Sequence, residues 1–194
     1  MPSPLSFFTI CSKNFFGYAR TLCESVRAQH PGASFHVALC DRMDGMIDPA
    51  SEPFETIPLE ALAIPGLAGM TERYNITELN TSIKPYVFEY LFGECDRQRV
   101  VYLDPDILVV SPLAEVDAHL GVDTDAVLTP HVLDPAENVE IDDIKMLQLG
   151  TYNLGFVALN RTDRVREIVR WWSRRLETQC VIDVPNGLFV DQKW

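Results

Sequence analysis

Two aspartates one residue apart offer the clearest chemistry in this chain. Asp104 and Asp106 flank Pro105 and lie between two apolar runs, Val-Val-Tyr-Leu before them and Ile-Leu-Val-Val after them. Carboxylates are costly to bury beside such runs unless they are paired or bind an ion. Their hard oxygen ligands suit Mg²⁺ or Mn²⁺ and leave coordination positions for phosphate oxygens. The pattern predicts a metal site, with a turn cap at Asp104 and a solvated Asp106 as the alternative.

The charge of the chain limits what such a site could bind. The 16 basic and 28 acidic residues give a formal net charge of −12, and the sequence has no extended run of Lys or Arg. Nucleic acid is therefore not expected as a partner. A nucleotide diphosphate would also be repelled unless a bound cation or a local basic group reversed the field at its site. This requirement again favours a metal.

Short strands and amphipathic helices must hold these aspartates in place. Strands are predicted over residues 5–10, 35–40, 99–103, 126–129 and 152–160, and helices over 16–29, 80–92 and 163–177. This alternation indicates an α/β fold with a mostly parallel sheet sandwiched by helices, and 194 residues favour a single domain, 1–194. Ligands of open α/β sheets bind beyond the carboxyl ends of strands, which is where Asp104 follows the strand over 99–103.

Local signals refine this prediction. Thr81 or Ser82 can cap the helix over 80–92, with Pro85 in its first turn, and Ser111-Pro112 can open another helix. The strand over 126–129 is expected to be buried, and residues 131–149 form an acidic, irregular stretch. The helix over 163–177 is expected to bury four apolar side chains: Val165, Ile168, Val169 and Trp172.

Cysteine usage and hydropathy bear on the compartment. The five cysteines are widely spaced and never form a C-x-x-C pair, so neither a disulfide framework nor a zinc site is indicated. A reducing, cytoplasmic setting fits this pattern. No apolar run approaches the roughly 18 residues of a membrane span, so any membrane association through this chain would be peripheral. The sequence leaves the oligomeric state open.

An ordered set of short motifs carries a family resemblance. The set comprises Thr9-Ile-Cys-Ser12, Tyr18-Ala-Arg20, Lys84-Pro85, Tyr102-Leu-Asp104-Pro-Asp106, Tyr152-Asn153-Leu-Gly155 and Asp191-Gln192. It spans nearly the whole chain and resembles the retaining GT-A glycosyltransferases of the glycogenin and galactosyltransferase type, glycosyltransferase family 8. The resemblance implies a Rossmann-like GT-A fold. It also implies transfer of a hexose, with retention, from a UDP-sugar to an unknown carbohydrate, lipid or protein acceptor, assisted by Mn²⁺ or Mg²⁺.

The same resemblance implies roles for individual residues. Asp104 and Asp106 would hold the metal, and Asp191 and Gln192 would be catalytic, beside the anomeric carbon of the sugar. The sugar nucleotide would be bound by Cys11, Ser12, Asn14, Tyr18, Lys84, Asp104, Asn153 and Gly155. The sequence also leaves alternatives: an ordinary polar loop over Cys11 to Asn14, a solvated surface lysine at Lys84, a strand asparagine at Asn153, a β-bulge glycine at Gly155, and surface polar residues at Asp191 and Gln192.

The chain departs from the family pattern after the Asp191-Gln192 pair. Members of the family carry a third metal ligand, a histidine, well beyond that pair, whereas His30, His36, His119 and His131 all precede it. We therefore expect a fragment that lacks a C-terminal portion of a longer enzyme. The alternative is a vestigial domain that binds sugar nucleotide without turnover. A phosphatase that uses Asp-x-Asp is less favoured, because bulky apolar residues follow Asp106.

Overall fold

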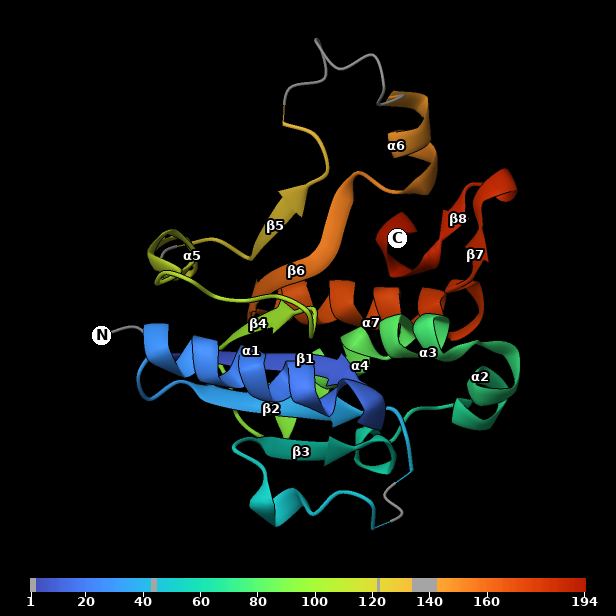
Figure 1. Ribbon diagram of the computed structural model, residues 1–194. Coiled ribbons are helices and arrows are strands. Elements are labelled where there is room, and N and C mark those ends of the chain that lie inside the picture. Colours follow the sequence, from blue (N-terminus) through green and yellow to red (C-terminus); the bar gives the residue numbers. More distant parts are fainter. Residues whose placement is uncertain (1–2, 43–44, 122, 134–142) are drawn as a thin grey trace.

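The protein is built around a six-stranded sheet with the strand order β3-β2-β1-β4-β6-β5 (Figure 1). The computed structural model describes residues 3–42, 45–121, 123–133 and 143–194, and the description that follows concerns these residues. The strands are β1 (Leu5–Cys11), β2 (Ser34–Leu39), β3 (Glu55–Pro58), β4 (Arg99–Leu103), β5 (Ala126–Pro130) and β6 (Tyr152–Asn160). A separate two-stranded ribbon joins β7 (Ile182–Asp183) to β8 (Leu188–Phe189).

The sheet is mostly parallel, as predicted. β1 pairs in parallel with both β2 and β4, and β2 pairs in parallel with β3. β6 runs antiparallel to its two neighbours, β4 and β5. The carboxyl end of β4 therefore meets the amino-terminal part of β6, which brings Asp104 beside Gly155.

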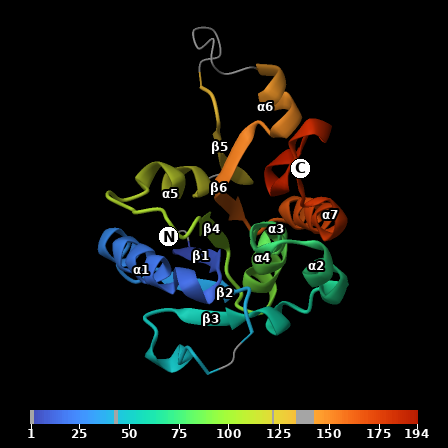
Figure 2. The same cartoon turned by 45° about the vertical axis from the view of Figure 1, so that its right-hand side comes forward.

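Helices cover both faces of this sheet (Figure 2). α1 (Phe16–Gln29) and α5 (Ala114–Leu120) pack on one face, and α3 (Ile76–Ser82), α4 (Lys84–Gly93) and α7 (Asp163–Gln179) pack on the other. Two shorter helices, α2 (Leu67–Arg73) and α6 (Asp143–Leu149), complete the set. The α/β fold with helices on both sides of the sheet is confirmed.

Alternating side chains of the central strands produce these two layers. All seven residues of β1 are buried, because the strand is covered on both faces. Phe7 packs into the cluster under α1, whereas Phe8 packs into the cluster under α4 and α7. Tyr102 and His36 pair with Phe8 from the neighbouring strands, so these three side chains form one row across the sheet on the α4 side.

The helix predicted over residues 80–92 is instead two helices, α3 and α4. Asn75 caps α3 through a reciprocal capping box, a start signal that lies five residues before the predicted helix. Thr81 and Ser82 are not caps, since their hydroxyls donate back to carbonyl oxygens within α3. Pro85 lacks the N–H group that would continue α3 into α4, and it lies in the first turn of α4, as predicted.

Four further predictions need correction. The helix after Pro112 begins only at Ala114, because the backbone of Leu113 has a ψ of 55° and is not helical. β5 is half-buried rather than buried, because it forms an edge of the sheet. Ile168 is 54% exposed, and Leu176 is buried in the same stripe of α7 instead. Part of the stretch over 131–149 is helical, as α6, while residues 134–142 lie outside the described residues.

The state of the cysteines and the character of the helices complete the description of the fold. All five cysteines are free thiols, and only Cys95 among them is not buried. None of the helices in the described part of the chain is both long enough and apolar enough to cross a membrane.

Candidate functional site

Asp104 follows β4 at the carboxyl edge of the sheet, where three contacts fix it. Its backbone N–H donates to the carbonyl oxygen of Gly155 on β6, over 2.8 Å. Its Oδ1 accepts a hydrogen bond of 2.5 Å from the hydroxyl of Tyr102. Its Oδ2 faces Gly155, where an added Cβ would come within 2.6 Å of that oxygen. Only glycine leaves room for the carboxylate in this position.

Asp106 differs from Asp104 in its surroundings. Its side chain is exposed, whereas that of Asp104 is half-buried. Among the described residues, no group of three or more His, Cys, Asp or Glu side chains could hold a metal ion. Mg²⁺ is commonly held by one or two carboxylates together with substrate phosphates and water. The acidic pair therefore fits an ion that is bound jointly with a diphosphate.

A groove leads from Asp104 to the loop after β1. Its inner part is a pocket of about 250 Å³ between Asp104, the loop around Ser12 and the helix α3. A second pocket of about 640 Å³ extends this space toward Arg20 and Asp41. The two pockets share Ser12, Asn14 and Ile76, so they lie side by side, and together they are called the groove. The groove lies at the edge of the sheet where α/β proteins bind nucleotides.

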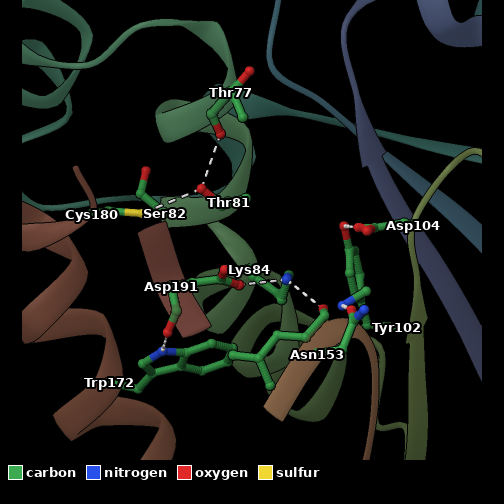
Figure 3. A network of polar contacts seen from close by, with 12 residues as sticks. Thr77, Thr81, Ser82, Lys84, Tyr102, Asp104, Asn153, Trp172, Cys180 and Asp191 are labelled. Carbon is green, nitrogen blue, oxygen red and sulfur yellow. Dashed lines mark hydrogen bonds and ion pairs between the residues drawn. The ribbon is translucent and has the colours of Figure 1, made fainter. Parts of the chain in front are cut away.

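Lys84 and Asp191 form a buried ion pair (Figure 3), next to Tyr102, which lines the inner pocket. The Nζ atom of Lys84 lies 2.5 Å from Oδ2 of Asp191 and donates over 2.7 Å to the carbonyl oxygen of Leu154. It also lies 4.2 Å from the centre of the Tyr102 ring, which is a cation–π contact. Lys84 is 1% exposed. The alternative of a solvated surface lysine is therefore wrong.

Burial and neighbouring charges shift the pKa values in this cluster. Burial raises the pKa of Asp191 above its ordinary value, and the ammonium group of Lys84 opposes that shift. Burial also raises the pKa of Tyr102 well above its ordinary value, and the carboxylate of Asp104 adds to this effect. Tyr102 therefore remains a hydrogen-bond donor at neutral pH.

The remaining predicted residues are divided between the groove and other places. Cys11, Ser12 and Asn14 line the inner pocket. Burial raises the pKa of Cys11 to about 12, so its thiol is protonated and a poor nucleophile. Tyr18 is 56% exposed on α1 and packs against Phe15.

Asn153 and Gly155 act together at the start of β6. Oδ1 of Asn153 accepts a hydrogen bond of 2.9 Å from the backbone N–H of Gly155. The side chain of Asn153 thus holds the backbone that faces Asp104. The register of β5 against β6 shifts between Leu128 and Thr129, close to this point.

Gln192 is directed to a different pocket from that of Asp104. It lines a largely apolar space of about 260 Å³ between β6 and α7, together with Leu154, Trp172 and Trp194. The carbonyl oxygen of Asp191, the residue before Gln192, accepts a hydrogen bond of 3.4 Å from the indole N–H of Trp172. Asp191 is 3% exposed and pairs with Lys84, so it is not a surface residue, whereas Gln192 lines this largely apolar pocket.

Two parts of the site were not predicted as functional. The hydroxyl of Tyr102 contacts Asp104, and Thr77, Asn80 and Thr81 of α3 line the inner pocket. The Oδ1 atom of Asn80 is buried and lacks a hydrogen-bond partner among the described residues. The register of β4 was a usable signal for Tyr102, since residues two apart lie on the same side of a strand. Thr77 was missed because the start of that helix was predicted at residue 80 instead of 76.

Comparisons with known proteins bear on the fold. No family model matches the chain. The uncharacterized protein YfnF of Bacillus subtilis (strain 168) is 27% identical over 144 residues, which cover 70% of this chain and 45% of YfnF. The chain thus spans less than half the length of this curated relative.

Solved structures are similar over nearly the whole chain. The galactosyltransferase LgtC, in complex with donor and acceptor sugar analogues, matches 96% of this chain and 71% of its own, with a TM-score of 0.63 and 21% identity. The glycosyltransferase GlyE of Streptococcus pneumoniae TIGR4 matches 98% of this chain and 42% of its own, with a TM-score of 0.54 and 13% identity. The chain has the GT-A fold. A further LgtC structure is of an active-site mutant in which a glutamine is replaced by glutamate.

Proposed function

We propose that this chain is the sugar-nucleotide-binding domain of a metal-dependent, retaining glycosyltransferase. It would take a hexose from a UDP-sugar and pass it to a carbohydrate, lipid or protein acceptor. One observation carries the proposal: Asp104 is held rigidly at the carboxyl edge of β4, facing a groove, with Lys84 and Asp191 paired nearby. The similarity of the fold to LgtC and GlyE supports the same class of reaction.

The nucleotide would lie in the groove between the loop after β1 and α3. The hydroxyl of Ser12 and the amide of Asn80 are 3.5 Å apart there, and both groups can hydrogen-bond to a base or a ribose. The unpartnered Oδ1 of Asn80 would gain a donor from the nucleotide. The diphosphate would then extend toward Asp104 and Asp106.

Asp104 and Asp106 would hold the divalent ion, Mn²⁺ or Mg²⁺. When bound, such an ion neutralises the negative charge that develops on a leaving diphosphate. Asp104 supplies a carboxylate whose orientation is already fixed by Tyr102 and Gly155, so little reorganisation is needed on binding. Asp106 is exposed and free of burial cost.

We propose that Asp191 and Gln192 are catalytic. Oδ2 of Asp191 is bonded to Lys84, which suits a residue that orients sugar hydroxyls rather than a free nucleophile. The glutamine in the active site of LgtC supports a role for Gln192. In the proposed reaction, the acceptor oxygen bonds to the anomeric carbon on the face from which the diphosphate leaves. The acceptor proton passes to an oxygen of the leaving diphosphate.

A second candidate is a domain that binds sugar nucleotide without turnover. It is favoured by the position of Gln192, which lines a different pocket from that of Asp104. Release of UDP from a UDP-hexose, followed with time, separates the two candidates. Metal-dependent binding without release would favour the binding domain.

The metal assignment is tested by replacing Asp106 with asparagine. We expect Asp106→Asn to abolish the part of UDP binding that depends on Mn²⁺, because an amide is a much weaker ligand for a hard cation. Isothermal titration of UDP with Mn²⁺ and with EDTA measures this part. Circular dichroism should be unchanged, because the side chain is exposed.

Asp163→Asn is the matched control for this experiment. Asp163 is also exposed, and it lies in the first turn of α7, outside the groove. Its replacement should leave Mn²⁺-dependent binding unchanged. If Asp106→Asn bound UDP and Mn²⁺ as tightly as the wild type, the metal assignment would be wrong.

A further inference from the structure

Tyr102 contacts both charged parts of the site. Its hydroxyl donates to Oδ1 of Asp104, and the face of its ring lies against the ammonium group of Lys84. We propose that Tyr102 is a positioning residue that fixes Asp104 for binding a divalent cation together with a nucleotide diphosphate. This inference rests on the proposed function. Tyr102 belongs to a motif that carried the family resemblance, but no role was predicted for it.

The tyrosine ring itself has little freedom to move. Tyr102 is 3% exposed and lies in the central strand β4, between Phe8 of β1 and Val157 of β6. Its ring packs against the ring of Phe8, with centroids 5.1 Å apart. The hydroxyl is therefore held at a fixed point just beyond the end of the strand, as Figure 3 shows.

A fixed hydroxyl restricts the carboxylate of Asp104. Tyr102 holds Oδ1, and Gly155 provides the space that Oδ2 occupies. Each carboxylate oxygen can accept more than one bond, so Oδ1 can accept from Tyr102 and still leave the group able to bind an ion. Without the hydroxyl, Asp104 would have to be ordered at the moment of binding, and that ordering would weaken the affinity.

The ring and the hydroxyl of Tyr102 make separate contacts. The ring face lies against the ammonium group of Lys84, which also contacts the carboxylate of Asp191 and the carbonyl oxygen of Leu154. The hydroxyl contacts Asp104. A phenylalanine at position 102 would keep the ring under Lys84 and remove only the bond to Asp104, so the proposed role can be isolated.

The test compares UDP binding to Tyr102→Phe in saturating Mn²⁺ and in EDTA. We expect binding in Mn²⁺ to weaken about tenfold, as for the loss of a hydrogen bond to a charged group, and binding in EDTA to be unchanged. Adding Tyr102→Phe to Asp104→Asn should weaken binding no further, because the hydroxyl acts through Asp104. Tyr86→Phe is the matched control, since its hydroxyl bonds to Ser173 between α4 and α7.

Asp104→Glu provides a second test that leaves Tyr102 in place. The longer side chain keeps the charge but moves the carboxylate away from the position that Tyr102 fixes, so we expect Mn²⁺-dependent binding to weaken at least tenfold. Full Mn²⁺-dependent affinity in either Tyr102→Phe or Asp104→Glu would overturn the inference. Equal weakening of Tyr102→Phe with and without Mn²⁺ would also overturn it. A wild-type chain whose UDP binding does not respond to Mn²⁺ would overturn the proposed function as well.

Discussion

His36 and Tyr102 lie in one row across the sheet, on either side of Phe8, yet their surroundings differ. The hydroxyl of Tyr102 contacts Asp104 and its ring lies against Lys84, so the side chain meets two charged groups. His36 is fully buried, and its Nδ1 lies 3.0 Å from Oε2 of Glu55, whose side chain is 67% exposed. Burial lowers the pKa of His36 to about 4, with Glu55 opposing and Arg97 supporting this shift.

This difference between Tyr102 and His36 distinguishes the polar residues of the candidate site from a buried polar residue outside it. At the carboxyl edge of the sheet, buried polar groups contact charged partners and border a groove. In β2, burial keeps the imidazole of His36 neutral at pH 7, with Glu55 and Arg97 as its charged neighbours. Polar burial in this chain is therefore informative about function only where charges of both signs converge beside a cavity.

The largest effect should follow from breaking the ion pair at the site. Lys84→Met would leave the carboxylate of Asp191 buried without its cation, so we expect the free energy of unfolding to fall by about 3–5 kcal/mol. Urea denaturation at pH 7 measures this. The double variant Lys84→Met, Asp191→Leu should recover part of the loss, because no uncompensated charge remains. A fall in the free energy of unfolding of less than about 1 kcal/mol in the single variant would mean that Asp191 takes up a proton at little cost in stability.

The next effect belongs to His36 and depends on pH. In the unfolded chain this histidine has a pKa of 6.5, whereas burial holds it at about 4 in the folded state. Between these values the unfolded state binds more protons, so stability is lost as the pH falls from about 6.5 to about 4. The difference corresponds to about 3 kcal/mol.

Urea denaturation of His36→Gln at several pH values measures this contribution. The variant should lose most of the dependence on pH within that window, whereas His119→Gln, at an exposed position, should keep it. A His36→Gln curve parallel to that of the wild type would show that another group carries the acid sensitivity.

A smaller effect should follow from filling the space beside Asp104. In Gly155→Ala the new Cβ would meet Oδ2 of Asp104 at 2.6 Å, so the carboxylate must move. We expect Mn²⁺-dependent UDP binding to weaken at least tenfold, or about 1.4 kcal/mol. Gly93→Ala at the end of α4 is the control, because an added Cβ there meets open space. Equal affinities for these two variants would show that the orientation of Asp104 does not matter.

The sequence was sufficient to predict the parts of the fold that have strong local signals. The strand over 99–103, the strand over 152–160 and the helix beginning at Phe16 agree with the structure, because their apolar residues give strong local signals. The division between α3 and α4 was missed, because an asparagine capping box was not considered. The half-buried state of β5 was missed because it depends on the order of strands, which local pattern does not encode.

The sequence indicated several of the residues that meet at the candidate site, but not their arrangement. Asp104 and Gly155 were both identified, although their contact comes from the antiparallel pairing of β4 with β6. The burial of Lys84 and its pairing with Asp191 join residues 107 positions apart, which no local pattern could indicate. Local pattern likewise could not indicate that Gln192 lines a separate pocket.

A crystal structure of the chain grown with Mn²⁺ and UDP tests the central claim most directly. The anomalous signal of manganese locates the ion independently of the nucleotide. We expect the ion within roughly 2.0–2.3 Å of carboxylate oxygens from both Asp104 and Asp106 and of diphosphate oxygens, with the nucleotide in the groove beside Ser12. UDP bound in that groove with both carboxylates bonded only to protein would contradict the metal site.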